Sequence, residues 1–381
     1  MNSDYRSGLK VGILGGGQLG RMFIQEALNF DVNVHILDPD PNAPCSQIAH
    51  SFEIGDIKDF DTVYAFGKGK DVITIEIEHV NVDALDKLAE EGIKVYPQPN
   101  VIRLIQDKGL QKEFYIENNI PTADFRLIEA NQKLDEHSDY LPFMQKSRTG
   151  GYDGKGVQVI KSSADFHKSF EGPSVLESFV DFEKELSVIV SRNENGDSNS
   201  FPIVELEFNP EANLVEFLFA PADVTDAIER EARTIATDII NKLEMVGILA
   251  VELFLTKDGK ILVNEIAPRP HNSGHQTIEA NYTSQYEQHL RSIINLPLGS
   301  TKAIKPSVMV NLLGEKEHIG KAKYQGIDEV ASWEGVYPHI YGKSDTKPFR
   351  KMGHVTVISD TLSAAKGIAI KVKETLKVIA E

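Results

Sequence analysis

The chain contains little cysteine, little tryptophan and no long hydrophobic run. Its 381 residues include one cysteine, Cys45, and one tryptophan, Trp333. A single cysteine excludes an intramolecular disulfide and a zinc site made of cysteines alone, and it is typical of the reducing cytosol. No apolar run approaches the roughly 18 residues of a membrane-spanning helix, and the polar N-terminus lacks the pattern of a signal peptide. We therefore expect a cytoplasmic protein with no membrane partner.

Basic residues are few relative to acidic ones. The chain has 40 lysines and arginines against 57 aspartates and glutamates, a net charge of −17. This excess of negative charge argues against nucleic acid as a partner, although it is compatible with a local basic pocket for one phosphate group. The hydrophobic share of 41% and the charged share of 25% are those of an ordinary globular protein. The length predicts two or three domains, and the composition favours an enzyme.

The first third of the chain alternates between predicted strands and helices. Apolar runs at residues 11–14, 32–37, 72–80 and 93–96 predict strands, and a helix is expected over residues 82–91. Strands that alternate with helices form a parallel sheet covered by helices. We therefore predict a doubly wound α/β domain at the N-terminus.

A glycine motif follows the first predicted strand. Residues 15–20 read GGGQLG, which satisfies the G-x-G-x-x-G pattern, and Asp38 lies eighteen residues after Gly20. One interpretation is a nicotinamide or flavin site, with the pyrophosphate at a helix N-terminus and Asp38 on a ribose hydroxyl. The other is a tight strand-to-helix turn whose amides are open to any phosphate. The motif alone does not separate a nicotinamide-dependent oxidoreductase from other phosphate-binding proteins.

A second glycine-rich segment lies between two predicted strands, residues 142–146 and 157–160. Residues 147–156 read SRTGGYDGKG. The segment is not a Walker loop, because Lys155 is followed by glycine rather than by serine or threonine. Its glycines and the cations around them predict a mobile flap that closes over phosphates. The alternative is an ordinary glycine hairpin.

A predicted hairpin places two carboxylates opposite each other. Residues 251–256 and 261–266 have strand-like patterns, and a two-residue turn at residues 258–259 would pair Glu252 with Glu265. The unpaired carboxylates would repel by roughly 1–3 kcal/mol, and a hard divalent cation such as Mg²⁺ removes that penalty. A nearby lysine or one protonated glutamate would also remove it. A slip of the register by one residue would separate the pair.

The loop after this hairpin concentrates polar side chains. Residues 269–275 read RPHNSGH, an unusual composition for a spacer. Arg269 is suited to clamp an oxyanion bidentately. A zinc site at His271 and His275 is not expected, because the segment lacks a helical context and further ligands.

Residues 175–180 and Glu185 give a weaker signal. An adenine ring needs backbone hydrogen bonds from an apolar linker, and a ribose needs a carboxylate such as Glu185. Taken alone, these residues are equally compatible with a solvated strand edge.

Three segments taken together resemble one family. Residues 15–22, 150–156 and 264–275 are similar, in the same order, to the ATP-grasp enzymes called 5-(carboxyamino)imidazole ribonucleotide synthases. The resemblance covers nearly the whole chain. It implies an α/β and α+β fold with a doubly wound pre-ATP-grasp domain, a central ATP-grasp domain with a lid and a small β-rich C-terminal domain. The implied ranges are residues 1–105, 106–300 and 301–381, with the lid at about residues 118–180.

The resemblance also implies a reaction of de novo purine biosynthesis. ATP phosphorylates bicarbonate to carboxyphosphate, and the amine of 5-aminoimidazole ribonucleotide captures the carboxyl group, which gives N5-carboxyaminoimidazole ribonucleotide, ADP and phosphate. The implied metal is Mg²⁺, with Mn²⁺ as a substitute, and the implied assembly is a homodimer. Within the superfamily the alternative is another carboxylate-amine ligase, such as formate-dependent glycinamide ribonucleotide transformylase. An oxidoreductase, or an ATP-binding regulator without chemistry, would belong to a different class.

Site residues follow from the resemblance, position by position. The implied ATP contacts are Lys108, Lys146, Gly151, Tyr152, Asp153, Gly154, Lys155, Gly156, Val157, Glu177, Ser178, Phe179, Val180, Glu185, Phe208, Asn264 and Glu265. The implied ribonucleotide contacts are Gly17, Gln18, Leu19, Glu76, Glu78, Arg269, His271, Asn272, Lys343 and Arg350. The implied metal ligands are Glu252 and Glu265, in agreement with the hairpin argument. The candidate catalytic residues are Lys146, Tyr152, Asp153, Arg269 and His271.

The sequence departs from the family pattern at three of these or neighbouring positions. Phe208 stands where a nucleotide-contacting histidine is usual, and phenylalanine can only stack or pack there. Val157 replaces a common glutamine, and His79 replaces a common asparagine. These changes leave the carboxylate pair and the loop at residues 269–275 intact.

Overall fold

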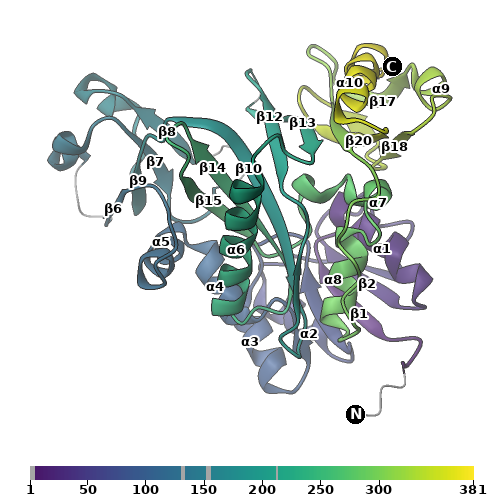
Figure 1. Cartoon of the computed structure of the whole chain (residues 1–381). Coiled ribbons are helices and arrows are strands. Elements are labelled where there is room, and N and C mark those ends of the chain that lie inside the picture. Colours follow the sequence, from purple (N-terminus) through teal and green to yellow (C-terminus); the bar gives the residue numbers. More distant parts are fainter. Residues whose placement is uncertain (1–4, 130–133, 152–155, 212) are drawn as a thin grey trace.

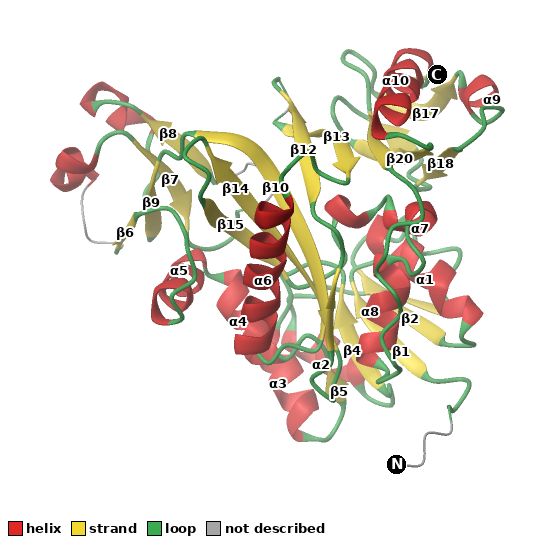
Figure 2. Ribbon diagram, viewed as in Figure 1, coloured by secondary structure: helices red, strands yellow, loops and turns green. Residues whose placement is uncertain are grey.

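The chain folds around a parallel sheet at its N-terminus, a small lid sheet and a long central sheet that reaches the C-terminal region (Figure 1). The computed structural model describes residues 5–129, 134–151, 156–211 and 213–381. Helices cover the faces of the sheets, as Figure 2 shows. The α/β and α+β architecture agrees with the prediction, while the three domain ranges stay a prediction.

The N-terminal sheet is parallel throughout, with the strand order β3-β2-β1-β4-β5. Helix α1 packs on one face, and α2 and α3 cover the other. The sheet therefore has the predicted doubly wound form. Its elements are β1 Lys10–Leu14, α1 Gln18–Asn29, β2 Asn33–Asp38, β3 Ser51–Ile54, α2 Phe60–Gly67, β4 Val72–Ile75, α3 Val82–Glu90, β5 Lys94–Val95 and α4 Pro99–Gln106.

One strand of this sheet is shorter than predicted. The alternating pattern predicted a strand over residues 72–80, but β4 ends at Ile75. The next residue, Glu76, turns its side chain to the N-terminus of α1. That interaction joins segments 59 residues apart, and a local alternation pattern carries no information about it.

The lid is an antiparallel sheet with the strand order β6-β9-β7-β8. Its core contains Ile128, Phe143, Ile160 and Leu176. Helix α5 leads into it from the N-terminal domain and packs near β9. The elements are α5 Lys108–Glu117, β6 Phe125–Ile128, the 3-10 helix Leu134–Tyr140, β7 Phe143–Ser147, β8 Val157–Ile160, the 3-10 helix Ser163–Lys168 and β9 Ser174–Ser178.

The central sheet runs without interruption into the C-terminal region, in the order β15-β14-β10-β12-β13-β16-β20-β18. Helix α6 packs on one face of β10, β14 and β15, and α8 packs on β10 and β14 and also against α1. Helix α8 therefore joins the central and N-terminal domains. The elements are β10 Phe182–Arg192, β11 Ser198–Ser200, β12 Val204–Asn209, β13 Leu214–Ala220, α6 Asp226–Lys242, β14 Gly247–Thr256, β15 Ile261–Ala267, the 3-10 helix Asn272–Gly274, α7 Thr277–Ala280 and α8 Gln285–Ile293.

The C-terminal region is rich in strands, as predicted. A second small sheet has the order β19-β17-β21, and α10 packs on β16 and β20 over a shared apolar core. The elements are β16 Ser307–Leu313, β17 Gly320–Gln325, α9 Ile327–Val330, β18 Val336–Ile340, β19 Asp345–Thr346, β20 Lys351–Ile358, α10 Leu362–Thr375 and β21 Lys377–Ala380.

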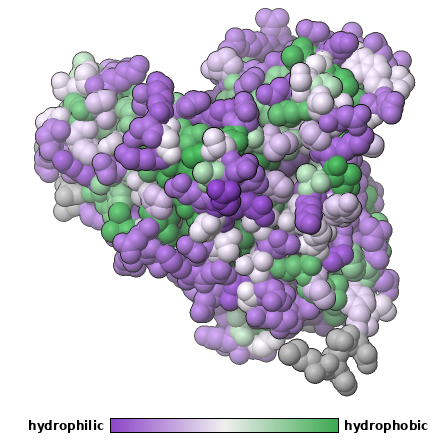
Figure 3. Space-filling model, viewed as in Figure 1, coloured by the Kyte–Doolittle hydropathy of each residue, from purple (hydrophilic) through white to green (hydrophobic). Residues whose placement is uncertain are grey.

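Most of the surface shown in Figure 3 is hydrophilic, and its hydrophobic residues form scattered patches. Among the described residues, no helix combines the length and the apolar character that crossing a membrane requires.

Candidate active site

The glycine motif surrounds a carboxylate of the chain itself. Glu76 accepts hydrogen bonds from the backbone N–H of Gly17 and, at 3.2 Å, of Leu19, at the N-terminus of α1. A Cβ atom on Gly17 would lie 2.2 Å from Glu76 Oε1. Asp38 accepts from the backbone N–H of Gly16 at 2.7 Å. Because the chain's own carboxylates use these amides, the interpretation as a pyrophosphate site of an oxidoreductase is not supported.

The two predicted metal ligands do face each other. Glu252 on β14 pairs with Glu265 on β15, as the sequence predicted. The predicted two-residue turn is wrong, however: the hairpin closes at Thr256, whose backbone N–H donates to the carbonyl of Lys260 at 2.9 Å. That closure alone would shift the register by one residue, and a β-bulge between Glu252 and Leu253 shifts it back.

The bulge also sets which way consecutive side chains point. In a regular strand, Asn264 and Glu265 would face opposite sides of the sheet. Here both contact lysines: Asn264 Oδ1 accepts from Lys146 Nζ at 3.2 Å, and Glu265 Oε1 accepts from Lys108 Nζ at 2.6 Å. The extra residue therefore brings an amide and a carboxylate to one cationic region.

The two paired glutamates differ in pKa. Burial, then the charges of Glu265 and Glu185, raise the pKa of Glu252 to about 7. Burial would also raise the pKa of Glu265, but Lys108, together with Lys146 and Arg269, outweighs burial and lowers the pKa. A divalent cation beside the pair would favour the ionised form of Glu252, which burial and the neighbouring carboxylates oppose. Glu252 and Glu265 therefore fit the predicted Mg²⁺ ligands. Within the described residues, no group of three or more His, Cys, Asp or Glu side chains is arranged to hold a metal ion.

A buried triad links the lid to this hairpin. The carboxylate of Glu177 on β9 forms ion pairs with Lys146 on β7 and with Lys112 on α5. Both of its side-chain oxygens are therefore engaged by cations. The sequence does not predict that Lys112 is buried in an ion pair, since an isolated lysine in a polar helix looks like an ordinary surface residue.

The predicted adenine and ribose contacts lie on or near the connection between lid and central sheet. Phe179 is exposed and Val180 half-buried, while the hydroxyl of Ser178 donates to Tyr140 Oη at 2.7 Å. Burial raises the pKa of Glu185 on β10 to about 7, and Lys146 acts in the opposite direction. Phe208 is half-buried against Val204, Leu206, Leu218 and Met309 of the central sheet.

The two strands predicted on either side of the flap are present, as β7 and β8. Gly150 and Gly156 have φ values of +77° and +73°, which glycine adopts at little cost. Ser147 donates its backbone N–H to the carbonyl of Gly156 at 2.8 Å, and Val157 pairs with Lys146. Gly151 lies beside them. The predicted contacts Tyr152, Asp153, Gly154 and Lys155 lie outside the described residues.

The polar loop after β15 lies against the same site. Arg269 Nε is 2.8 Å from Glu78 Oε1, and His271 Nε2 is 3.6 Å from Glu252 Oε1. Burial, then the charges of Arg269 and Lys351, lower the pKa of His271 to about 3. The imidazole is therefore neutral near pH 7, with Nδ1 2.9 Å from Ser273 Oγ.

The C-terminal region holds this loop and carries two of the predicted cations. Asn272 and Asn311 on β16 exchange amide hydrogen bonds of 2.9 Å. Lys343 Nζ donates to the carbonyl of Lys351 at 2.7 Å, and Arg350 donates to the carbonyl of Asp345 at 2.6 Å. Of this group, Lys351 acts electrostatically on both His271 and Glu252, so it belongs with Lys343 and Arg350 as a candidate cation of the site.

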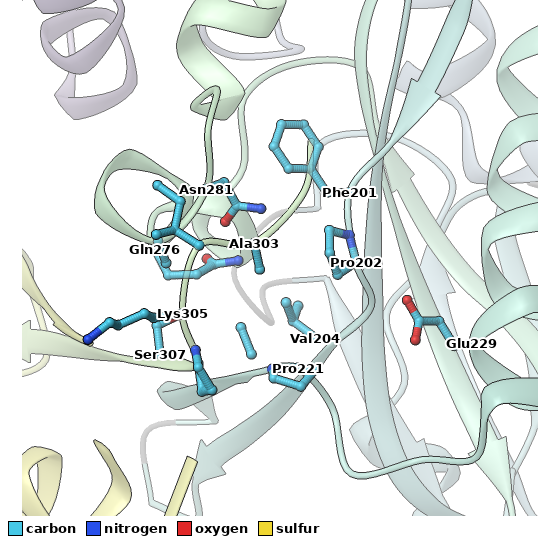
Figure 4. A pocket seen from close by; sticks show the side chains of 14 residues that line it. Phe201, Pro202, Val204, Pro221, Glu229, Gln276, Asn281, Ala303, Lys305 and Ser307 are labelled. Carbon is cyan, nitrogen blue, oxygen red and sulfur yellow. The ribbon is translucent and has the colours of Figure 1, made fainter. Parts of the chain in front are cut away.

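A cavity of about 330 Å³ lies elsewhere, between the central sheet and the segment leading to β16 (Figure 4). Its lining includes Phe201, Val204, Pro221, Gln276 and Lys305. None of the predicted site residues that the structure describes lines it.

Three family profiles match the chain in order. They are the ribonucleotide synthetase preATP-grasp domain over residues 9–106, the ATP-grasp domain over residues 113–286 and the phosphoribosylaminoimidazole carboxylase C-terminal domain over residues 307–367. These matches, together with a lid sheet and a central sheet that carries a carboxylate pair, place the chain in the ATP-grasp ligase family.

Comparison with individual relatives shows to which family within this class the chain belongs. The N5-carboxyaminoimidazole ribonucleotide synthase of Bacillus subtilis is 38% identical over 92% of this chain and 91% of its own length. The crystal structure of the N5-carboxyaminoimidazole ribonucleotide synthetase from Thermotoga maritima has a TM-score of 0.90, with 44% identity over 98% of this chain and 100% of that chain. The chain belongs to the N5-carboxyaminoimidazole ribonucleotide synthase family.

Two further comparisons bear on function and length. An Aspergillus clavatus enzyme solved with ADP and 5-aminoimidazole ribonucleotide has a TM-score of 0.86 and 35% identity, over 97% of this chain and 99% of its own. The chain spans about two thirds of the length of other curated relatives, 65% and 64% for two phosphoribosylaminoimidazole carboxylases.

Proposed function

We propose that the protein carboxylates the amine of 5-aminoimidazole ribonucleotide at the expense of ATP and bicarbonate, in de novo purine biosynthesis. A bicarbonate oxygen attacks the γ-phosphorus of ATP, which gives carboxyphosphate and ADP. The amine nitrogen then attacks the carboxyl carbon, the C–O bond to phosphate breaks, and the nitrogen loses a proton. The observation that carries this proposal is that paired carboxylates, lysines and an arginine–histidine loop converge on one site in a member of this family.

The residues divide the work by their chemistry. Lys108 and Lys146 are suited to hold the phosphates of ATP, and Arg269 to hold an oxyanion. Glu252 and Glu265 would hold Mg²⁺, or Mn²⁺ in its place, which neutralises phosphate charge when bound. The flap that the sequence predicts at residues 150–156 would exclude water from the mixed anhydride, which hydrolyses readily.

His271 acts in this proposal by orientation. With its pKa lowered to about 3, the imidazole is neutral and only weakly basic. It can accept or donate one hydrogen bond toward the substrate through Nε2 while Nδ1 stays with Ser273. Asp153 is the other candidate for receiving the proton of the amine. A cytoplasmic location and a homodimer complete the proposal, as the family and the single cysteine suggest.

Phosphate release from ATP, Mg²⁺ and bicarbonate tests the proposal, with and without 5-aminoimidazole ribonucleotide. We expect strong stimulation by the ribonucleotide that disappears when bicarbonate is removed. Stimulation by glycinamide ribonucleotide and formate instead would identify a transformylase. Release that responds to none of these acceptors would contradict the proposed reaction.

A further inference from the structure

Lys112 is a cation buried where the lid meets the central sheet. Its side chain is only 5% exposed, and it lies in the middle of α5, four residues after Lys108. A buried ammonium group is costly unless a partner compensates its charge. Its partners are the Glu177 carboxylate and, at 2.5 Å, Thr122 Oγ1.

Glu177 divides its two oxygens between two lysines. Oε1 contacts Lys112 and Oε2 contacts Lys146. Burial alone would raise the pKa of Glu177, but Lys146 and Lys112 together lower it, so the carboxylate is ionised. Two cations thus share one negative charge, and the group carries a net positive charge.

The two lysines are not equivalent. Lys146 is more exposed, at 13%, and also reaches Asn264 beside the metal-ligand pair. Lys112 has a different second contact, Thr122 Oγ1, which in turn donates to the carbonyl of Val263 at 2.8 Å. Lys112 therefore connects Glu177 in the lid to the strand that carries Asn264 and Glu265.

We propose that Lys112 is a positioning residue for nucleotide binding. It compensates the charge of Glu177, so that the ammonium group of Lys146 can leave Glu177 and contact a phosphate. This inference rests on the proposed function, because it assumes that phosphates of ATP lie beside Lys146. Lys112 itself does not touch them.

The charge balance explains why this role is needed. If Lys112 were absent, Lys146 would be the counter-ion that neutralises buried Glu177. Moving it to a phosphate would then leave an uncompensated buried carboxylate, which is the costly arrangement. Phosphate binding would weaken, while contacts to adenine and ribose would stay in place.

Calorimetric binding of ATP, ADP and adenosine to the full chain tests this. For Lys112→Met we expect the Kd for ATP and ADP to rise about 10- to 100-fold, because Lys146 would lose its charge-assisted contact with a phosphate. The Kd for adenosine should change by less than about threefold. Lys373→Met, which removes a lysine paired with Glu216 at 2.6 Å on the C-terminal domain, is the matched control and should leave all three unchanged.

A double variant separates positioning from structural support. Glu177→Gln removes the charge that holds Lys146, so Lys112→Met combined with Glu177→Gln should bind ATP more tightly than Lys112→Met alone. Lys112→Arg keeps the cation and should bind ATP better than Lys112→Met does. If Lys112→Met does not fold, Thr122→Val loosens the anchor of Lys112 and should weaken ATP binding more than adenosine binding.

Three results would overturn the inference. They are unchanged ATP binding by Lys112→Met, equal losses for ATP and adenosine, and a double variant that binds ATP no better than Lys112→Met. Failure of the wild-type chain to bind ATP would instead refute the proposed function, and this inference with it.

Discussion

Ion pairs between lysines and glutamates dominate the site at the residue scale. Lys108 holds Glu265 and Lys146 holds Glu177, whereas Glu252 faces the neutral imidazole of His271 at 3.6 Å. Glutamates in such surroundings differ in pKa although their chemistry is the same. Their roles are therefore distinguishable by charge-removing substitutions.

Glu265→Gln should remove the predicted metal ligand that ionises more readily, since the pKa of Glu265 is lowered and that of Glu252 is raised. We expect phosphate release to fall by about 100-fold or more, beyond the 10- to 100-fold loss typical of outer-shell changes. The fold should survive, because the glutamine keeps the shape of the side chain. Asp258→Asn at the exposed tip of the same hairpin is the control and should keep wild-type rates. Wild-type activity of Glu265→Gln at limiting Mg²⁺ would contradict the metal assignment.

Glu252 should make stability depend on pH. Its pKa is about 7 in the folded chain against 4.5 for the ordinary group, so the folded state binds more protons between these values. Stability then falls as pH rises from about 4.5 through 7. Glu252→Gln lacks this titration, so its stability relative to wild type should increase by on the order of 2 kcal/mol from pH 5 to pH 8.

Urea unfolding without metal or nucleotide measures this difference. The exposed substitution Glu334→Gln serves as the control, and its stability should follow wild type across the same pH range. Parallel pH profiles for wild type and Glu252→Gln would show that Glu252 ionises normally.

Two irregular elements shape the site at the scale of strands and helices. The bulge in β15 lets Asn264 and Glu265 contact lysines together, and the early end of β4 lets Glu76 reach the N-terminus of α1. In both cases a regular element is interrupted where a functional side chain needs a different direction.

Gly17→Ala should disturb the second of these elements by steric conflict. Its φ of −80° is ordinary, but the new Cβ would lie 2.2 Å from Glu76 Oε1 and displace the carboxylate. We expect a loss of about 1–3 kcal/mol in the free energy of unfolding, measured in urea, because the amides lose their buried acceptor.

The comparison for this variant is Gly69→Ala. That glycine has a φ of +76°, and a Cβ added there would meet nothing within 4 Å, so the cost is backbone strain of about 1 kcal/mol. The ribonucleotide KM should rise in Gly17→Ala and not in Gly69→Ala. An equal effect of the two substitutions on KM would exclude the glycine loop from the substrate site.

The whole molecule brings three regions to one site. The central sheet continues from the hairpin of Glu252 and Glu265 to β20 in the C-terminal region, and α8 fixes the N-terminal sheet against it. The C-terminal region is therefore placed to contribute cations to a substrate that the N-terminal loop is also predicted to contact. That arrangement predicts a division of labour between ribonucleotide and ATP.

Replacing Lys343 and Arg350 together by alanine should raise the ribonucleotide KM by about tenfold or more and leave the KM for ATP nearly unchanged. The reason is that a 5′-phosphate would lose charge-assisted hydrogen bonds. Lys351→Ala should act in the same direction, since its charge already reaches His271. Replacing Lys321 and Lys323, exposed on β17 of the same region, provides the control. Equal changes in both KM values would mean that this group does not bind the ribonucleotide phosphate.

Local patterns in the sequence were sufficient for most of the predicted elements, though not for the end of β4 or the hairpin turn, and for part of the site. Alternating strands and helices predicted the doubly wound sheet, and the hairpin pattern predicted the pairing of Glu252 with Glu265. That pairing was correct although the turn was wrong, because the bulge compensated for the longer turn. Periodicity and turn chemistry act over a few residues, so a single sequence carries them.

Tertiary structure alone decided which opposite charges meet. Lys112 and Glu177 are 65 residues apart, and Glu76 and Gly17 are 59 apart. In the sequence each is one of many charged residues or glycines, and nothing local distinguishes a buried ion pair from a solvated side chain. The sequence by itself therefore determined the family, the elements and the carboxylate pair. The burial that pairs Lys112 with Glu177, neutralises His271 and raises the pKa of Glu252 arises only when distant segments pack together and exclude water.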